Sequence, residues 1–188
     1  MGQKAITIYT PEGSAAHITA EDDAFIHRVI LGSTSGILGA LTCARVDDNT
    51  VRLSGGGVSN RGYILWIPDG ETLELSIDSG AAGYSRIDTV VSEFVKGSGN
   101  TADIHTLKII KGTAATGTAS APSMTASNLL NTGDVNQLAL FYVHIEGTEI
   151  TGISRAADIL PQSSGSSPTF YIQQTQPSSP RTGDLWFW

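Results

Sequence analysis

The four histidines are the side chains of this sequence best suited to bind metals or transfer protons, and they are widely spaced. His17, His27, His105 and His144 fall in four separate predicted segments. No two of them have the H-x-x-x-H or H-E-x-x-H spacing that places two zinc ligands on one helix. His105 and His144 lie in predicted strands and would meet if those strands paired, but ordinary strand histidines are the preferred interpretation. The sequence therefore predicts no metal site and implies no cofactor.

Carboxylates are more numerous, and among 18 Asp and Glu residues some pair meets the separation used in glycoside hydrolysis by chance. Glu93 is the carboxylate whose pKa burial would raise, because it shares a strand face with Val91 and Val95. A cross-strand Lys108 or Lys111 is the simpler explanation of its position. Since no nucleophile, metal or phosphate motif accompanies it, we predict that the protein is not an enzyme.

Three further motifs have structural explanations. Cys43 lies in the apolar run LTCARV, where a buried, unreactive thiol is expected. Residues 55–57 are three glycines with no Lys-Ser or Lys-Thr pair and no helix after them, which favours a backbone bulge or corner over a phosphate loop. The acidic residues 21–23 fit the first turn of a helix capped by Thr19 better than a cation site.

Composition limits the possible functions. At 188 residues the chain suits one domain with a substantial core, and 21 glycines with only 15% charged residues are typical of short strands joined by tight turns. The formal net charge of -7 and the 11 Lys and Arg residues argue against binding to nucleic acid or anionic lipid. We recognise no signal peptide and no apolar run of ~20 residues, so we expect no membrane insertion.

The strongest structural signal is a β-hairpin of residues 87–95 and 104–111, joined by a loop that opens Gly97-Ser98-Gly99-Asn100. Apolar residues lie on both faces of each strand, which favours a central, covered pair. A short helix is predicted from Thr19 to Gly32, with Ala24, Phe25, Val29 and Ile30 as its apolar stripe, followed by a loop over residues 32–36. Other strands are predicted at residues 5–9, 41–46, 51–53, 63–67, 72–77, 138–146 and 149–153, with a turn at Pro68-Asp69-Gly70.

These elements predict an all-β fold, a β-sandwich or jelly-roll-like domain with one short N-terminal helix and a C-terminal aromatic extension. Residues 1–160 form the β-rich domain, residues 161–168 a linker, and residues 169–188 an aromatic arm. We expect the arm to dock on a neighbouring subunit or partner protein, and packing on its own domain is the alternative. The candidate interface residues are Trp66, Phe170, Tyr171, Leu185, Trp186, Phe187 and Trp188.

The central hairpin also carries a family resemblance. A strand reading RIDTVV, then a hairpin, then a strand ending IIKGT, a small-residue segment with Pro122, and the strand LALFYVHIEG together resemble tail and baseplate proteins of tailed bacteriophages and prophages. The similarity covers roughly residues 6–160. It implies a virion protein of the tail tip or baseplate that is assembled in the host cytoplasm and forms a homo-oligomer, most often a trimer.

Two functions follow from this resemblance. One is an oligomeric adaptor that joins tail or fibre components, with the aromatic residues buried between subunits. The other is a receptor-binding tail protein that recognises host cell-wall glycan, with exposed Trp and Tyr side chains stacking on sugars. The position of Trp66, Trp186 and Trp188 distinguishes them, because an open groove lined by these residues favours the second.

Overall fold

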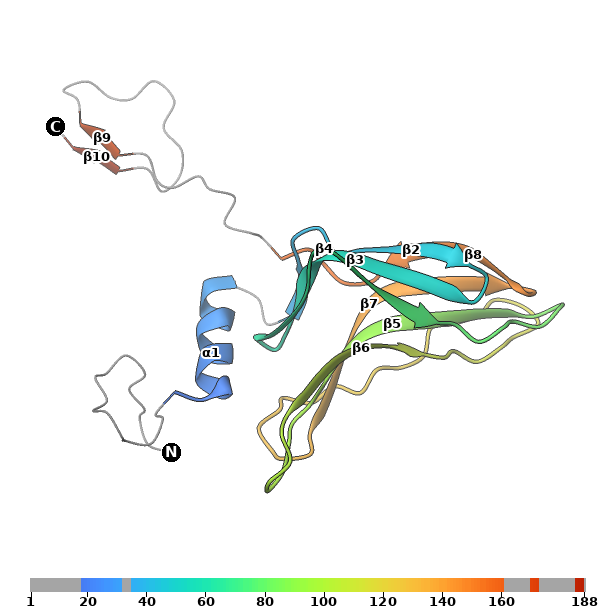
Figure 1. Ribbon diagram of the computed structural model, residues 1–188, viewed down its shortest axis with the longest axis horizontal. Coiled ribbons are helices and arrows are strands. Elements are labelled where there is room, and N and C mark those ends of the chain that lie inside the picture. The colour runs from blue at the N-terminus through green and yellow to red at the C-terminus, as the bar shows by residue number, and fades with distance from the viewer. Residues whose placement is uncertain (1–17, 32–34, 161–169, 173–184, 188) are drawn as a thin grey trace.

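The computed structural model describes residues 18–31, 35–160, 170–172 and 185–187 (Figure 1). One helix, α1 (Ala20–Leu31), precedes two antiparallel four-stranded sheets. The predicted all-β fold with a short N-terminal helix is confirmed. The predicted strand at residues 5–9, the linker at residues 161–168 and Trp188 lie outside the described residues.

Helix α1 begins where the sequence predicts. The Oγ1 of Thr19 accepts a hydrogen bond from the backbone N–H of Asp22 at 3.4 Å, and the backbone N–H of Thr19 donates to Asp22 Oδ2 at 2.7 Å. This is a capping box with aspartate at its third helical position, and it satisfies backbone donors that the first turn of a helix leaves free.

The first sheet is built around β3 (Thr50–Asn60). On one side β3 pairs in turn with β1 (Ser35–Leu38) and β2 (Thr42–Asp47), and on the other side with β4 (Tyr63–Ser76). Strand β1 begins inside the segment predicted as a loop, so the loop prediction is wrong from Ser35 onward. Backbone pairing with the far end of β3 orders residues whose local sequence favours a turn.

Glycines shape the middle of this sheet. The β3–β4 register shifts between Ser54 and Gly56, where Gly55 and Gly56 have φ values of 55° and 108°. The predicted bulge is therefore confirmed, since only glycine adopts such angles without strain.

Opposite the bulge, Pro68-Asp69-Gly70 does not reverse the chain, so the predicted turn at these residues is wrong. The residues on either side, Ile67 and Thr72, both pair with β3, so the turn residues form an irregularity within one strand.

The second sheet has the strand order β6-β5-β7-β8. Its strands are β5 (Ser85–Val95), β6 (Ile104–Ile110), β7 (Val135–Glu146) and β8 (Glu149–Arg155). The predicted hairpin is confirmed, with Val95 opposite Ile104 and Thr89 opposite Ile110. Of the two hairpin strands, however, only β5 is central in the sheet, because β6 lies at its edge. The partner on the other side of β5 is β7, from a distant part of the sequence.

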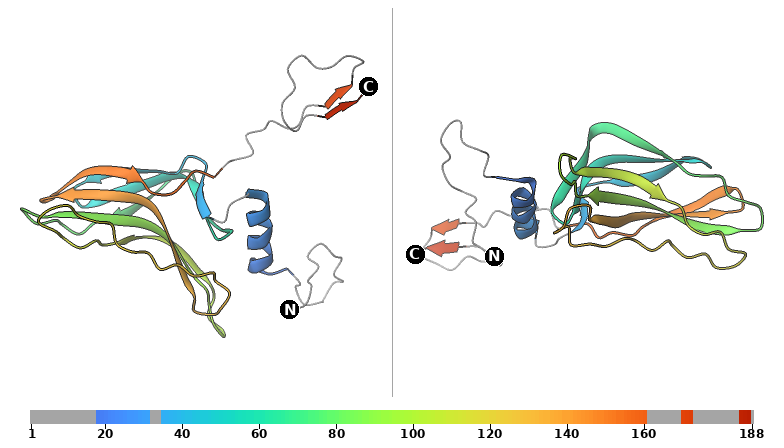
Figure 2. Two further views of the ribbon diagram at one scale, coloured as in Figure 1. Left: turned by 180° about the vertical axis from the view of Figure 1, so that it is seen from behind. Right: turned by 90° about the horizontal axis from the view of Figure 1, so that it is seen from below.

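Side chains from both sheets form one core, with Val51, Leu53 and Val58 of β3 facing the second sheet and Val90, Leu140 and Val143 facing the first. Figure 2 shows the two layers from behind and from below, with α1 beside one end. At the β2–β8 border, Arg45 Nη1 donates to the carbonyl of Ile150 at 2.7 Å and closes the sandwich. At the opposite border β4 lies beside β6, and no hydrogen bond joins the described residues of these two strands.

Two short strands follow near the end of the chain. Strands β9 (Phe170–Ile172) and β10 (Leu185–Phe187) pair in parallel with each other and belong to neither sheet of the sandwich. Within the described part of the chain, no helix combines the length and apolar character needed to cross a membrane.

Candidate functional site

The carboxylate singled out by the sequence, Glu93, is held by partners. Lys108 Nζ donates to Glu93 Oε1 at 2.7 Å, and Gln137 Nε2 donates to Oε2 at 2.6 Å. Burial alone would raise the pKa of Glu93, but these two hydrogen bonds outweigh it, and the pKa is lowered. The expectation of a raised pKa is therefore wrong. The cross-strand Lys108 predicted as the simpler explanation is present.

The strand histidines lie apart. His105 on β6 is opposite Phe94, whereas His144 on β7 is opposite Ile87 and Gly152, so β5 separates the two. Burial lowers the pKa of His105 to about 4, and its Nε2 lies 2.7 Å from Ser92 Oγ. His105 is therefore a neutral, hydrogen-bonded side chain at neutral pH.

Cys43 and the described His, Asp and Glu residues form no group that could hold a metal ion. The Cys43 side chain packs against the core, and burial raises its pKa to about 11, which leaves almost no thiolate at neutral pH. Across residues 18–31 and 35–160, no cluster of three or more His, Cys, Asp or Glu side chains is arranged to hold a metal ion.

The RID and IIKGT motifs meet in a buried polar cluster. Arg86 Nε donates to Asp88 Oδ1 at 2.8 Å, and the same carboxylate oxygen accepts the backbone N–H of Gly112 at 2.9 Å. A Cβ on Gly112 would lie 2.1 Å from the carbonyl oxygen of Ile87, so no other residue fits there. The two motifs of this chain therefore specify how the strand ends pack, and the buried charge is paired and hydrogen-bonded.

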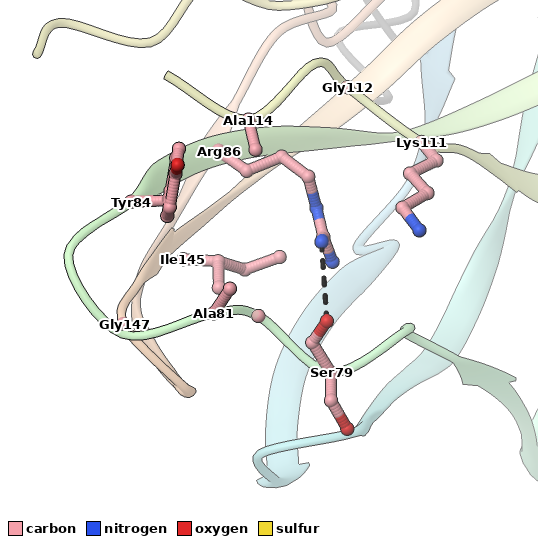
Figure 3. Close-up of a pocket in the computed structure, with 10 residues that line it drawn as sticks. Ser79, Ala81, Tyr84, Arg86, Lys111, Gly112, Ala114, Ile145 and Gly147 are labelled. Atoms are coloured by element: carbon pink, nitrogen blue, oxygen red, sulfur yellow. Dashed lines mark hydrogen bonds between the residues drawn. The ribbon is translucent and has the colours of Figure 1, made fainter. Parts of the chain in front are cut away.

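A pocket of about 240 Å³ lies beside this cluster (Figure 3). Figure 3 shows the Arg86 guanidinium directed at the backbone carbonyl of Ser79, which accepts a bond from Nη1 at 3.4 Å. Arg86 Nη2 also donates to the carbonyl of Asp78 at 2.5 Å, and Lys111 Nζ pairs with the Asp78 carboxylate at 2.7 Å. Both cations of the pocket are thus engaged within the chain, and they tie the segment before β5 to the second sheet.

The other notable feature is helix α1, which is firmly docked on the β3–β4 turn. His27 Nδ1 lies 2.9 Å from the carbonyl oxygen of Gly62, and Lys96 forms an ion pair with Glu21. Gly62 has φ of +87°, and a Cβ on it would lie 2.1 Å from the carbonyl oxygen of Ala24. Backbone and polar contacts therefore hold the helix, and Ala24 is its one buried apolar side chain.

Three residues of the predicted apolar stripe of α1 face outward, whereas the fourth, Ala24, is buried. The side chains of Phe25, Val29 and Ile30 are 52%, 66% and 74% exposed, and Ile26 is exposed as well. Contiguous exposed apolar side chains of this size mark interaction surfaces in soluble proteins. We call these four exposed residues the helix stripe.

Strand β4 adds exposed apolar residues and a groove. Ile64 and Trp66 lie on its outer side, and Trp66 is 65% exposed. Beside Trp66, a groove of about 330 Å³ lies between residues of β4 and β6, and we call it the edge groove. Its apolar lining consists of Leu65, Trp66, Ile67, Pro68, Leu73 and Leu107. The helix stripe and the edge groove are the candidate functional site, an interaction surface.

Of the predicted interface residues, Trp66 belongs to this surface. Phe170 and Tyr171 are in β9, opposite Leu185 and Trp186 of β10 in the backbone register. The backbone thus brings those four together, and docking of the arm stays a prediction. Sequence reasoning missed the edge groove, because it depends on two edge strands from different sheets meeting at one border. It did find Phe25, Val29 and Ile30 of the helix stripe but not Ile26, and periodicity alone does not reveal which way a stripe faces.

No protein-family model and no curated protein matches this chain.

Proposed function

We propose that this chain is a homo-oligomeric structural protein of a bacteriophage tail tip or baseplate, where it joins tail or fibre components. The observation that carries this proposal is the exposed apolar surface of α1 and β4. The part on α1 faces outward although the helix itself is firmly docked on its own chain. The assignment to a phage tail rests on the resemblance of residues 86–91 and 109–113 to that family. On the same ground we place the protein in the virion, with a trimer as its expected form.

The free energy gained by covering the helix stripe alone barely meets the cost of association, so further surface must take part. Burying a large apolar side chain fully contributes about 1.5–3 kcal/mol, so covering four half-exposed ones contributes roughly 5 kcal/mol. This is close to the lower end of the cost of association, about 4 kcal/mol. A stable oligomer therefore also needs Trp66 and the edge groove, or the C-terminal arm, to be covered.

Electron microscopy of tailed particles labelled with an antibody against this chain tests the proposal. We expect label at the tail tip or baseplate of intact particles, and particles incubated with pre-immune antibody serve as the control. Particles that carry no label, in a culture where the chain is produced but stays in the fraction without virions, would contradict the proposal.

A sugar-binding tail protein is the second candidate, because Trp66 is exposed beside a groove that also carries Glu71, Thr72 and Thr106. Exposed aromatic rings with nearby polar groups are typical of such sites. If the purified protein is retained on isolated host cell walls and Trp66→Ala releases it, this function replaces the adaptor.

A further inference from the structure

Glu93 lies between a lysine and a primary amide on the second sheet. It is on β5, opposite Gln137 of β7, and Lys108 is on β6 at the other side of β5. Lys108 Nζ donates to Glu93 Oε1 at 2.7 Å, and Gln137 Nε2 donates to Oε2 at 2.6 Å. One carboxylate therefore holds the amine from one neighbouring strand and the amide from the other.

The carbonyl group of the same amide has a backbone donor. The N–H of Thr125, in the segment between β6 and β7, donates to Gln137 Oε1 at 2.8 Å. The carbonyl of Thr125 accepts the backbone N–H of Gln137, also at 2.8 Å, so this donor is fixed in place. A fixed N–H at a carbonyl oxygen stabilises the negative charge that develops there when a nucleophile attacks the carbonyl carbon.

The exposure of these side chains suits a reaction between them. The Glu93 side chain is 12% exposed, and Val91, the preceding residue on the same strand face, is fully buried. Burial raises the pKa of Glu93, but its hydrogen bonds lower it more, so the carboxylate is ionised at neutral pH and can accept a proton. The Lys108 side chain is 43% exposed and flexible, so its amine is free to move from Oε1 to the amide carbon. An amine beside a base, and a carbonyl with a donor on its oxygen, are the parts that acyl transfer needs.

We propose that Lys108 and Gln137 join in an intramolecular isopeptide bond, with Glu93 as the group that transfers protons. The Nζ–Cδ bond forms as the Cδ–Nε2 bond of Gln137 breaks. Lys108 begins as an ammonium group and keeps one hydrogen on the new amide nitrogen. Its other two protons pass by way of Glu93 to Nε2, which leaves as ammonium, and Glu93 ends ionised as it began. The step involves no oxidation or reduction and needs no co-reactant.

The bond links β6 to β7 across β5. Groups held together in one molecule react at effective concentrations of about 10⁵ M or more, which compensates for the low reactivity of a primary amide. Like a disulfide, the bond stabilises the fold by restricting the unfolded chain. It forms once in each chain, requires no turnover, and does not depend on the proposed function.

The mass of the intact, denatured chain tests the proposal, measured after purification and again after prolonged incubation at neutral pH. We expect the wild type to be lighter than its sequence mass by about 17 Da, the mass of one ammonia. A tryptic digest should contain a branched peptide that joins Lys108 to Gln137. Lys108→Arg keeps the positive charge but has no nucleophilic amine, and Glu93→Gln has no base, so both should keep their full sequence mass. Lys111→Arg, at a lysine paired with the carboxylate of Asp78, should lose ammonia as the wild type does.

Other outcomes overturn the proposal. A wild type that keeps its full sequence mass after the incubation contradicts it. Loss of ammonia that persists in Lys108→Arg comes from another site and contradicts it as well. If Glu93→Gln forms the branched peptide as readily as the wild type, the role of Glu93 is wrong. Circular dichroism verifies that the variants fold, and the presence or absence of the branched peptide in the wild type decides the matter if a variant does not.

Discussion

At the scale of single residues, the clearest consequence concerns His105. Its ring meets Phe94 edge-on, with centroids 5.5 Å apart, and its Nε2 lies 2.7 Å from Ser92 Oγ. Burial lowers its pKa from 6.5 to about 4, so between these values the unfolded chain binds a proton that the folded chain does not. Stability contributed by neutral His105 is therefore full above pH 6.5 and is lost as pH falls toward 4.

We predict that the wild type loses more stability on acidification than His105→Gln. The excess loss should be on the order of 2 kcal/mol between about pH 7 and about pH 4, after allowance for solvent contact at the ring. Urea unfolding curves at a series of pH values measure this difference directly. Equal losses for the two proteins would show that His105 gains its proton as freely in the folded state as in the unfolded chain.

At the scale of elements, the docking of α1 depends on Gly62. Its φ of +87° is unfavourable for other residues, and a Cβ would lie 2.1 Å from the carbonyl oxygen of Ala24. Gly70 has nearly the same φ, +84°, but a Cβ there meets no atom within 4 Å. Alanine at Gly70 therefore measures the cost of backbone strain alone, and alanine at Gly62 measures that cost together with the cost of displacing the helix.

We predict that Gly70→Ala costs about 1 kcal/mol through backbone strain alone. Gly62→Ala should cost more and should also release α1. Amide hydrogen exchange along residues 20–31 measures that release, and we expect it to accelerate in Gly62→Ala but not in Gly70→Ala. Equal exchange rates in both variants would mean that the helix does not depend on this contact.

Elements whose signals are local were predictable from the sequence. The Thr19 cap, the hairpin of β5 and β6 and the glycine bulge in β3 depend on neighbouring residues, and each is present. The turn at Pro68 was wrong because pairing with β3 overrides local turn chemistry. The predicted rise in the pKa of Glu93 was wrong because Gln137, a partner distant in sequence, offsets the effect of burial. The edge groove was missed for the same reason, since it needs strands from two sheets.

At the scale of the whole molecule, the chain combines a packed core with an exposed apolar surface. The sandwich is held together by its own core and by buried polar contacts such as Arg86 with Asp88. Several of its exposed large apolar side chains lie on α1 and β4, and a groove lined by β4 and β6 adjoins Trp66. A folded domain with an exposed apolar surface apart from its core can associate with further copies of itself, as a repeated structural component of a particle must.

The mass of the wild-type protein in solution tests the proposed self-association. Light scattering coupled to size exclusion, at several micromolar concentrations, should give a whole multiple of the 19.7 kDa chain, with three chains expected from the resemblance. A single sharp peak at 19.7 kDa at every concentration would contradict the account.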